Sequence, residues 1–455
     1  MSTDTPAREL RTYRAWARAH QLAGGVRDAA FPPLVQQLMQ SPLHQCPDAQ
    51  LIVDGDQAFR AMLSAIDEAR DEVLLETYIL RDDRIGREVE RALARAVTRG
   101  ARVNVLADAV GSLETKSEFW AGLTRDGITV RLFHRLRYLP FQALRRDHRK
   151  IVVIDRTVAF TGGMNIGVEY GSSIRHHDAG AWRDTLVRLH GSVAEELAAV
   201  FAEGWDRADG PPLQGLEYIS WDEQTLALRA TREWSFRGQS LMTRVEQQLA
   251  RVRPRTRGRR VRRRVDAGAD TRTSTALVLD SRPGRGQREV LAVFASLIGG
   301  ARQRLWITTP YFAPPSRALS LLRAASRRGV DVRLLVPGEK TDVPLARHAA
   351  HGVYRALLQS GVRVFEYQRA TLHSKTLVVD GSAGVVGSTN IDFRSFWLNA
   401  ECNVLLFDSA MAHDLETAFT NDCAQSIEIT EAVWIQRTWW HAIGDWCARQ
   451  LRVVL

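Results

Sequence analysis

The sequence has little cysteine, little lysine and no long hydrophobic run. Its four cysteines form no Cys-x-x-Cys pair, so neither a disulfide framework nor a structural zinc site is favoured, and a reducing compartment fits best. The longest stretch without Asp, Glu, Lys or Arg, residues 29–47, contains four prolines and is too broken and too polar to span a bilayer. The N-terminal residues have no apolar core before a small-residue cleavage site, so we expect no cleaved signal peptide.

The positive charge of the chain is concentrated in one segment. The formal net charge is +10, but nine arginines lie within residues 251–264 with no acid among them, and the rest of the chain is almost neutral. The high pI therefore does not indicate a general nucleic-acid surface, and we consider nucleic acid an unlikely partner. The arginine run is either a solvated linker or a contact with an anionic surface such as a membrane, and the sequence leaves both open.

An internal repeat organises the chain. A helix, a β-rich run, a helix and a second β-rich run are predicted at residues 54–69, 72–80, 85–100 and 101–108, and again at 287–301, 304–312, 317–329 and 330–337. Alternating helices and strands of this kind predict an α/β fold with one sheet in each half.

The repeat sets the expected boundaries. We expect an N-terminal extension at 1–50, a first lobe at 51–208, an Arg-rich linker at 209–274, a second lobe at 275–430 and an amphipathic C-terminal helix at 431–455. The C-terminal helix carries four of the twelve tryptophans, with apolar residues at helical spacing and arginines on another face. Its apolar stripe can pack on the protein or lie in a membrane interface.

Each half also carries one His-x-Lys-x4-Asp motif, followed by a short strand and a Gly-rich turn ending in Asn. The motifs comprise His148, Lys150, Asp155 and Asn165 in the first half, and His373, Lys375, Asp380 and Asn390 in the second. Residues two apart on an extended strand point to the same side, so each motif can present an imidazole and an ammonium together. Both cationic positions are Lys although the chain has only four lysines and 58 arginines, which indicates that a compact ammonium is required.

Two His–Lys pairs suit a phosphodiester substrate. The lysines can neutralise the nonbridging oxygens, one neutral imidazole can attack phosphorus, and the other, as imidazolium, can protonate the departing alcohol. The sequence contains no His-Glu-x-x-His motif, no EF-hand loop and no clustered carboxylates beside the motifs. We therefore expect a site that uses neither a metal ion nor a cofactor.

The duplicated motif resembles the phospholipase D superfamily over residues 50–430. The segments Arg394–Phe396 and Leu398–Glu401 are similar to bacterial cardiolipin synthases, and Trp182–Asp184 is similar to the Trp-Arg-Asp strand of the family. The resemblance implies two pseudo-symmetric lobes, each a mixed sheet flanked by helices, with the active site at their interface. It also implies that Asp184 and Glu401 hydrogen-bond the histidines and fix their tautomers.

The resemblance further implies a phosphatidyltransferase. We expect it to condense two phosphatidylglycerol molecules to cardiolipin and glycerol through a phosphatidyl-histidine, with His148 as nucleophile and His373 as acid and then base. The long synthases of the family begin with two membrane-spanning helices that this sequence lacks, so it resembles the shorter type. We expect peripheral attachment to the cytoplasmic face of the bacterial cell membrane. Hydrolysis of phospholipids, a nucleic-acid phosphodiesterase and a non-catalytic membrane-binding protein are the alternatives.

Several motif residues admit two interpretations. Asp155 and Asp380 are grouped with the catalytic residues, although their position at a strand end also fits structural ion pairs. Asn165 and Asn390 can donate to phosphate oxygens, which makes them candidate substrate-binding residues, or they can cap the Gly-rich turn.

Other polar residues are less informative. His176 and His177 lie in a polar stretch and are expected at the surface rather than as ligands. Asp108 and Glu76, at the ends of predicted strands, are candidates for lining the cleft.

Overall fold

The structure is a computed structural model, and it describes residues 5–133, 145–171, 181–214 and 274–435, which belong to one compact unit. Three features of the sequence lie outside the described residues: His176 with His177, the arginine run at 251–264, and the C-terminal segment beyond residue 435.

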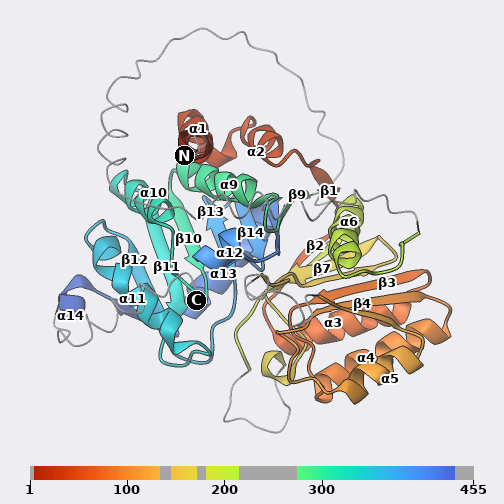
Figure 1. Ribbon diagram of the computed structural model, residues 1–455. Helices are drawn as coiled ribbons and strands as arrows, with labels where there is room; N and C mark the ends of the chain where they lie inside the picture. The colour runs from red at the N-terminus through yellow and green to blue at the C-terminus, as the bar shows by residue number, and fades with distance from the viewer. Residues whose placement is uncertain (1–4, 134–144, 172–180, 215–273, 436–455) are drawn as a thin grey trace. The chain divides into compact units, whose positions relative to one another are not determined.

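The first repeat forms a seven-stranded mixed sheet in the order β2-β8-β7-β6-β3-β4-β5. Its elements are β2 (Ala49–Ile52), α3 (Gly55–Glu68), β3 (Glu72–Thr77), α4 (Arg84–Thr98), β4 (Arg102–Asp108), α5 (Ser117–Arg125), β5 (Thr129–Phe133), β6 (Ile151–Ile154), β7 (Val158–Gly162), η3 (Val168–Tyr170), β8 (Leu186–His190) and α6 (Ser192–Arg207). Strands β3, β4 and β5 are parallel to one another, and the other pairs are antiparallel. Helices α3 to α5 lie on one face of the sheet and α6 on the other (Figure 1).

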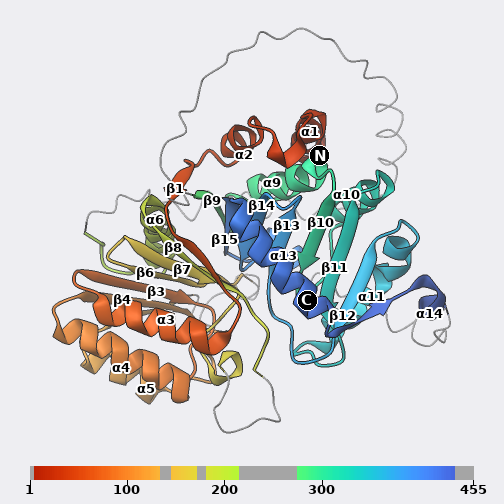
Figure 2. The same cartoon turned by 180° about the vertical axis from the view of Figure 1, so that it is seen from behind.

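The second repeat builds a nine-stranded sheet in the order β1-β9-β15-β14-β13-β10-β11-β12-β16. Its elements are β9 (Ser274–Ser281), α9 (Gln287–Gly300), β10 (Arg304–Thr308), α10 (Ser316–Arg327), β11 (Asp331–Pro337), α11 (Pro344–Leu358), β12 (Arg363–Tyr367), β13 (Thr376–Val379), β14 (Ala383–Gly387), α12 (Phe393–Trp397), β15 (Glu401–Phe407), α13 (Ser409–Cys423), β16 (Ser426–Ile429) and α14 (Glu431–Ile435). The run from β9 to β12 repeats the order of the first sheet, and α13 covers one face as α6 does there (Figure 2). The predicted fold of two α/β repeats is confirmed.

Local sequence signals explain where the elements begin. The carboxylate of Asp54 caps α3 by accepting the backbone N–H of Gln57 at 2.8 Å, and Asp83 caps α4 in the same way through Gly86 at 2.9 Å. Strand β3 is buried along its whole length, as expected for a central strand flanked by helices on both faces.

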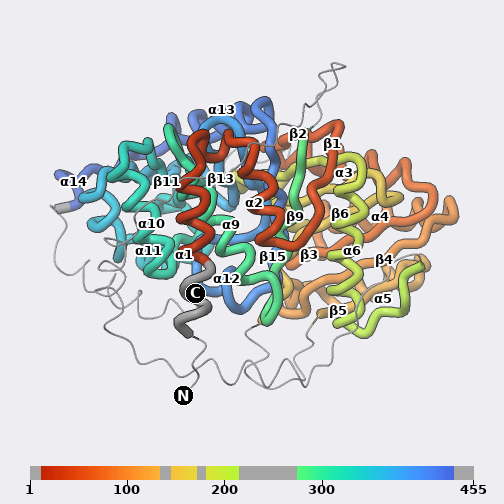
Figure 3. Tube along the Cα trace, turned by 90° about the horizontal axis from the view of Figure 1, so that it is seen from above, coloured from red at the N-terminus to blue at the C-terminus, as the bar shows by residue number. Residues whose placement is uncertain are grey.

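The N-terminal extension belongs to the second sheet. Helices α1 (Thr5–Gln21) and α2 (Phe31–Met39) pack on α9, and the 3-10 turn η1 (Gly25–Arg27) joins them (Figure 3). Strand β1 (His44–Cys46) then pairs antiparallel with β9 at the sheet edge, three residues before the chain enters the first sheet as β2. The expected extension at 1–50 is therefore a layer of the second lobe and a link to the first.

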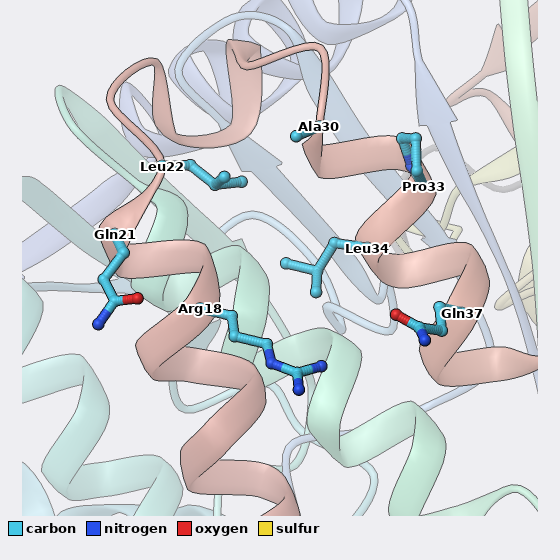
Figure 4. A pocket seen from close by; sticks show the side chains of 7 residues that line it. All are labelled: Arg18, Gln21, Leu22, Ala30, Pro33, Leu34 and Gln37. Atoms are coloured by element: carbon cyan, nitrogen blue, oxygen red, sulfur yellow. The ribbon is translucent and has the colours of Figure 1, made fainter. Parts of the chain in front are cut away.

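A shallow pocket of about 440 Å³ opens between α1 and α2 (Figure 4). Leu22 and Leu34 supply apolar walls, and Arg18 supplies a charged side chain. No residue of the His-x-Lys motifs lines this pocket.

The two repeats share a core and an ion pair. One apolar cluster joins side chains of both sheets, among them Val187 of β8 and Val404 of β15, with residues of α6 and α13. Arg149, which is 1% exposed, places Nη2 2.6 Å from Oδ1 of Asp280 in the second repeat. Within the described part of the chain no helix combines the length and the apolar character needed to cross a membrane.

Candidate active site

The two motif histidines lie at the starts of corresponding strands, and each is fastened to the opposite repeat. The backbone N–H of His148, just before β6, donates to the carbonyl of Ala400 at 2.9 Å. The backbone N–H of His373, just before β13, donates to the carbonyl of Arg183 at 2.8 Å. Both imidazoles are buried. Since each bond crosses between repeats, the position of each histidine depends on both.

Each imidazole is also oriented by an acid from the other repeat. Nδ1 of His148 lies 3.0 Å from Oε2 of Glu401. Nδ1 of His373 lies 2.7 Å from Oδ2 of Asp184. A carboxylate at Nδ1 holds the N–H on that nitrogen, which leaves Nε2 as the nitrogen that can attack phosphorus or carry a proton.

The acid of the second repeat is itself held by a hydroxyl. Ser388 Oγ donates to Oε2 of Glu401 at 2.5 Å, the same oxygen that contacts His148. Burial opposes ionisation of Glu401, but His148 and this hydroxyl favour the carboxylate and hold its pKa below the usual range. The corresponding residue of the first repeat is Gly163, where a Cβ would lie 2.1 Å from Oδ1 of Asp184. Asp184 therefore leaves room only for glycine at position 163, whereas Glu401 leaves room for the serine at position 388.

The two lysines lie beside the histidines and are buried with them. Lys150 Nζ donates to the carbonyl of His148 at 2.7 Å. Lys375 Nζ donates to the carbonyl of His373 and lies 2.9 Å from Nδ1 and 3.2 Å from Nε2 of that ring. Burial, together with the charge of Lys375, lowers the pKa of Lys150 to about 7, and burial lowers the pKa of Lys375 to about 8. Two ammonium groups kept close in a buried site favour an anionic ligand between them.

The surroundings of both imidazoles disfavour their protonated forms. Burial, and then the charge of Lys150, lowers the pKa of His148 to about 4. Burial and Lys375 lower the pKa of His373 in the same way. A bound phosphodiester anion adds negative charge and raises both values, so substrate binding itself favours an imidazolium that can act as an acid.

The two motif asparagines lie in different environments. Asn165 accepts the backbone N–H of Ile79 at 3.2 Å and donates to the hydroxyl of Tyr170 at 2.7 Å, so its amide supports the turn. The backbone N–H of Asn390 donates to Ser395 Oγ at 3.1 Å, and its buried Oδ1 has no hydrogen-bond partner.

The motif aspartates bind backbone N–H groups at the other end of their strands from the histidines. Asp155 accepts three backbone N–H groups, those of residues 70 to 72, and Asp380 accepts those of residues 302 to 304, at 2.8–2.9 Å. Each aspartate follows its lysine by five residues of extended chain, roughly 16 Å. These carboxylates connect neighbouring strands at the opposite end of the sheet. They do so through hydrogen bonds from backbone N–H groups rather than through the expected ion pairs.

Two other acids proposed for the cleft are buried in structural contacts. Asp108 accepts the backbone N–H of Asp147 at 2.9 Å and contacts Arg146, so it fixes the segment that leads into His148. Glu76 lies 3.6 Å from Arg149, and burial raises its pKa well above the usual range. No three His, Cys, Asp or Glu side chains of the described ranges are grouped as metal ligands.

Sequence reasoning gave no role to the aromatic rings around the histidines. The Tyr78 ring lies 5.1 Å from that of His148. Three rings surround His373, with centroid-to-centroid distances of 5.5 Å for Tyr170, 5.4 Å for Trp182 and 6.4 Å for Tyr311. Tyr78 follows β3 directly, whereas Tyr311 lies three residues after β10 and corresponds to Ile79 of the first repeat, so the alignment of the repeats does not single out these rings.

Comparisons with known proteins agree with this geometry. A family model described as cardiolipin synthase, PLD-like domain, matches residues 62–203 and 294–423. A cardiolipin synthase of Listeria monocytogenes serotype 4b is 30% identical over 416 residues, which cover 91% of this chain and 76% of the relative. One from Halalkalibacterium halodurans is 30% identical over 96% of this chain and 77% of the relative.

A solved structure has the same fold. The phosphatidylserine synthase of Haemophilus influenzae Rd KW20 superposes with a TM-score of 0.64 at 15% identity, covering 92% of this chain and 98% of that one. The family model spans both repeats and each contains an intact His-x-Lys pair. The expected resemblance is confirmed, and the chain belongs to the cardiolipin synthase family of proteins with phospholipase D-like domains.

Proposed function

We propose that the chain is a phosphatidyltransferase that condenses two phosphatidylglycerol molecules into cardiolipin and glycerol. The observation that carries the proposal is the crossed pair of His–acid contacts, Glu401 on His148 and Asp184 on His373, with one buried lysine beside each imidazole. Membership of the cardiolipin synthase family supports phospholipids as substrates and phosphatidyl transfer as the reaction.

In the first step Nε2 of His148 attacks phosphorus of the first phosphatidylglycerol. The bond from phosphorus to the glycerol oxygen breaks, and the imidazolium of His373 gives its proton to that oxygen. Lys150 and Lys375 neutralise the nonbridging oxygens as charge builds on them. Attack needs a neutral ring, and burial lowers the pKa of His148 to about 4; because burial lowers the pKa of His373 as well, the shift is compatible with this assignment but does not choose between the two histidines.

In the second step a hydroxyl of the second phosphatidylglycerol attacks the same phosphorus. Neutral His373 takes the hydroxyl proton, the bond from phosphorus to His148 breaks, and cardiolipin leaves. The enzyme regains its starting protonation state and no water is consumed. Water in place of the second lipid would give phosphatidic acid. Which of the two, lipid hydroxyl or water, reaches the phosphatidyl-histidine therefore decides between transfer and hydrolysis.

We place the protein at the cytoplasmic face of a bacterial membrane, attached peripherally. Its substrates are membrane lipids, and both halves of the reaction need a lipid at the buried histidines. The arginine run at 251–264 and the tryptophan-rich C-terminal segment are the sequence features best suited to an anionic bilayer surface.

The test is product analysis with phosphatidylglycerol vesicles. Purified protein, without added metal, should yield cardiolipin and glycerol in equal amounts. His148→Ala and His373→Ala should each abolish both products while the protein remains folded by circular dichroism. Phosphatidic acid and glycerol without cardiolipin would make the protein a hydrolase, and no lipid turnover would reject the proposal.

A further inference from the structure

The two histidines differ in the charge that surrounds the tyrosine next to each. Tyr78, beside His148, lies near Arg394 and Arg146, whose charges oppose the rise in its pKa caused by burial and Asp108. Beside His373 lies Tyr311, whose counterpart in the first repeat is Ile79 rather than Tyr78, and its hydroxyl donates to a carboxylate. A reaction that treated its two sides alike would not need this difference.

The carboxylate is that of Asp342, which lies just before α11. Asp342 is exposed, Tyr311 is partly exposed and His373 is buried, so Tyr311 links an exposed carboxylate to the buried imidazole. Tyr311 contacts both of the other residues, through its hydroxyl to Asp342 and through its ring to His373 at 6.4 Å. An alcohol that approaches His373 from the side of Tyr311 meets these two side chains.

We propose that Tyr311 and Asp342 form the subsite for the head-group glycerol of the alcohol that enters or leaves beside His373. The inference rests on the proposed function and names the alcohol side of that site. Tyr311 uses its proton on Oδ2 of Asp342, so its oxygen and Oδ1 of Asp342 can both accept hydrogen bonds. The free hydroxyls of a glycerol head group can donate to two such acceptors, whereas a water molecule is too small to bridge them and reach phosphorus.

The charge of the subsite fits this assignment. In the proposed mechanism Lys150 and Lys375 bind the phosphate anion, so the neutral polyol is the part of the lipid that a carboxylate can approach without repulsion. The negative charge of Asp342 also favours the protonated form of His373. A residue that helps to bind the alcohol therefore also helps the acid that must protonate it.

The experiment measures how the phosphatidyl group divides between the lipid alcohol and water. Asp342→Asn and Tyr311→Phe should each lower the ratio of cardiolipin to phosphatidic acid about tenfold, the factor expected for a lost hydrogen bond to a charged group. Cardiolipin and phosphatidic acid are measured in the same preparation, so their ratio does not depend on how much protein is folded, and a wild type that forms no phosphatidic acid sets the upper limit of the ratio. Glu339→Gln, which removes an exposed carboxylate three residues from Asp342, should leave the ratio unchanged.

The outcomes separate this inference from the proposed function. Wild-type protein that forms phosphatidic acid but no cardiolipin would overturn both. Wild-type protein that forms cardiolipin, with the ratio unchanged in Asp342→Asn and Tyr311→Phe, would overturn the subsite alone. Ethanolamine added as a competing alcohol gives the third arm. If Asp342→Asn lowered transfer to ethanolamine and spared transfer to glycerol, the subsite would bind an ammonium group and the polyol assignment would fall.

Discussion

Two lysines in a chain that otherwise uses arginine carry much of the argument for the site. Lys150 and Lys375 are both buried and each binds the carbonyl of its neighbouring histidine. Burial lowers the pKa of each, so the energy of an ammonium in this site depends on an anion nearby. The lysines therefore bind the phosphodiester more strongly than they would at the surface.

Replacing either lysine with arginine should lower the rate of cardiolipin formation at least about a hundredfold, because a planar guanidinium is larger and places its charge differently. The rates are measured with purified Lys150→Arg and Lys375→Arg. Lys340→Arg, at an exposed lysine, is the matched control and should retain the wild-type rate. Near-normal rates in the first two variants would show that any cation suffices.

The buried histidine predicts a pH dependence of stability. The pKa of His148 is about 4 in the folded protein and about 6.5 in the unfolded chain. Between these values the unfolded state binds more protons, so the free energy of unfolding falls as the pH drops through this window. Between pH 7 and pH 5 the protonation of His148 should lower the free energy of unfolding by on the order of 2 kcal/mol.

Urea unfolding at pH 5, 6 and 7 measures this effect. His148→Gln should remove about 2 kcal/mol of the pH-dependent loss, whereas His413→Gln, at an exposed histidine, should leave it intact. Equal pH slopes in wild type and His148→Gln would mean that His148 is not held neutral.

At the scale of single elements, strands β6 and β13 each carry one motif, with different functional groups at their two ends. The end near the lysine presents the imidazole, and the far end presents an aspartate that accepts three backbone N–H groups where the chain enters the neighbouring strand. Asp380 has a φ of 52°, in the left-handed region, which turns the chain tightly into β14. The aspartate fixes the strand so that the histidine at its other end is held in place.

Asp380→Ala should therefore lower stability by about 3 kcal/mol, because three partly buried backbone N–H groups each lose an acceptor worth about 1 kcal/mol, and the folded fraction should keep its activity within about twofold. Denaturant unfolding and cardiolipin formation per folded molecule measure the two effects. Asp414→Ala, at an exposed position on α13, is the control and should change stability by less than about 0.5 kcal/mol. A stable but inactive Asp380→Ala would return this residue to the catalytic group.

The sequence predicted the repeated elements and the histidines because both leave local signals. Helical periodicity and capping residues such as Asp54 mark α3, and two rare lysines mark the motifs. The sequence left two roles open for Asp155 because spacing along a strand says where a residue lies but not what approaches it. Strand β1 was missed because three residues carry no periodicity, and its pairing with β9 joins segments more than 200 residues apart.

At the scale of the whole molecule, the two repeats complete each other. Glu401 of the second repeat orients His148 of the first, and Asp184 of the first orients His373 of the second. Neither repeat has a complete histidine–acid pair of its own. The sequence supplied the four residues, but their crossing depends on how the sheets pack and leaves no mark in the order of residues along the chain.

The crossed histidine–acid contacts predict how the rate depends on the leaving group in variants of Asp184 and Glu401. A phosphatidyl ester of 4-nitrophenol needs no proton on its departing oxygen, so it bypasses the acid. Release of nitrophenol should survive in Asp184→Asn, which disturbs the acid His373, and should fall about a hundredfold in Glu401→Gln, which disturbs the nucleophile His148. With phosphatidylglycerol both variants should be slow. The reverse order of rescue would exchange the roles of the two histidines.

The covalent intermediate is the most direct test of the whole account. His373→Ala is mixed with the nitrophenyl ester, quenched within one turnover and digested, and the peptides are examined by mass spectrometry. We predict one equivalent of nitrophenol in a burst and a phosphatidyl group on His148, because attack proceeds while the base for the second step is missing. Turnover without any phosphatidyl-histidine, or a phosphatidyl group on another residue, would contradict the proposed mechanism.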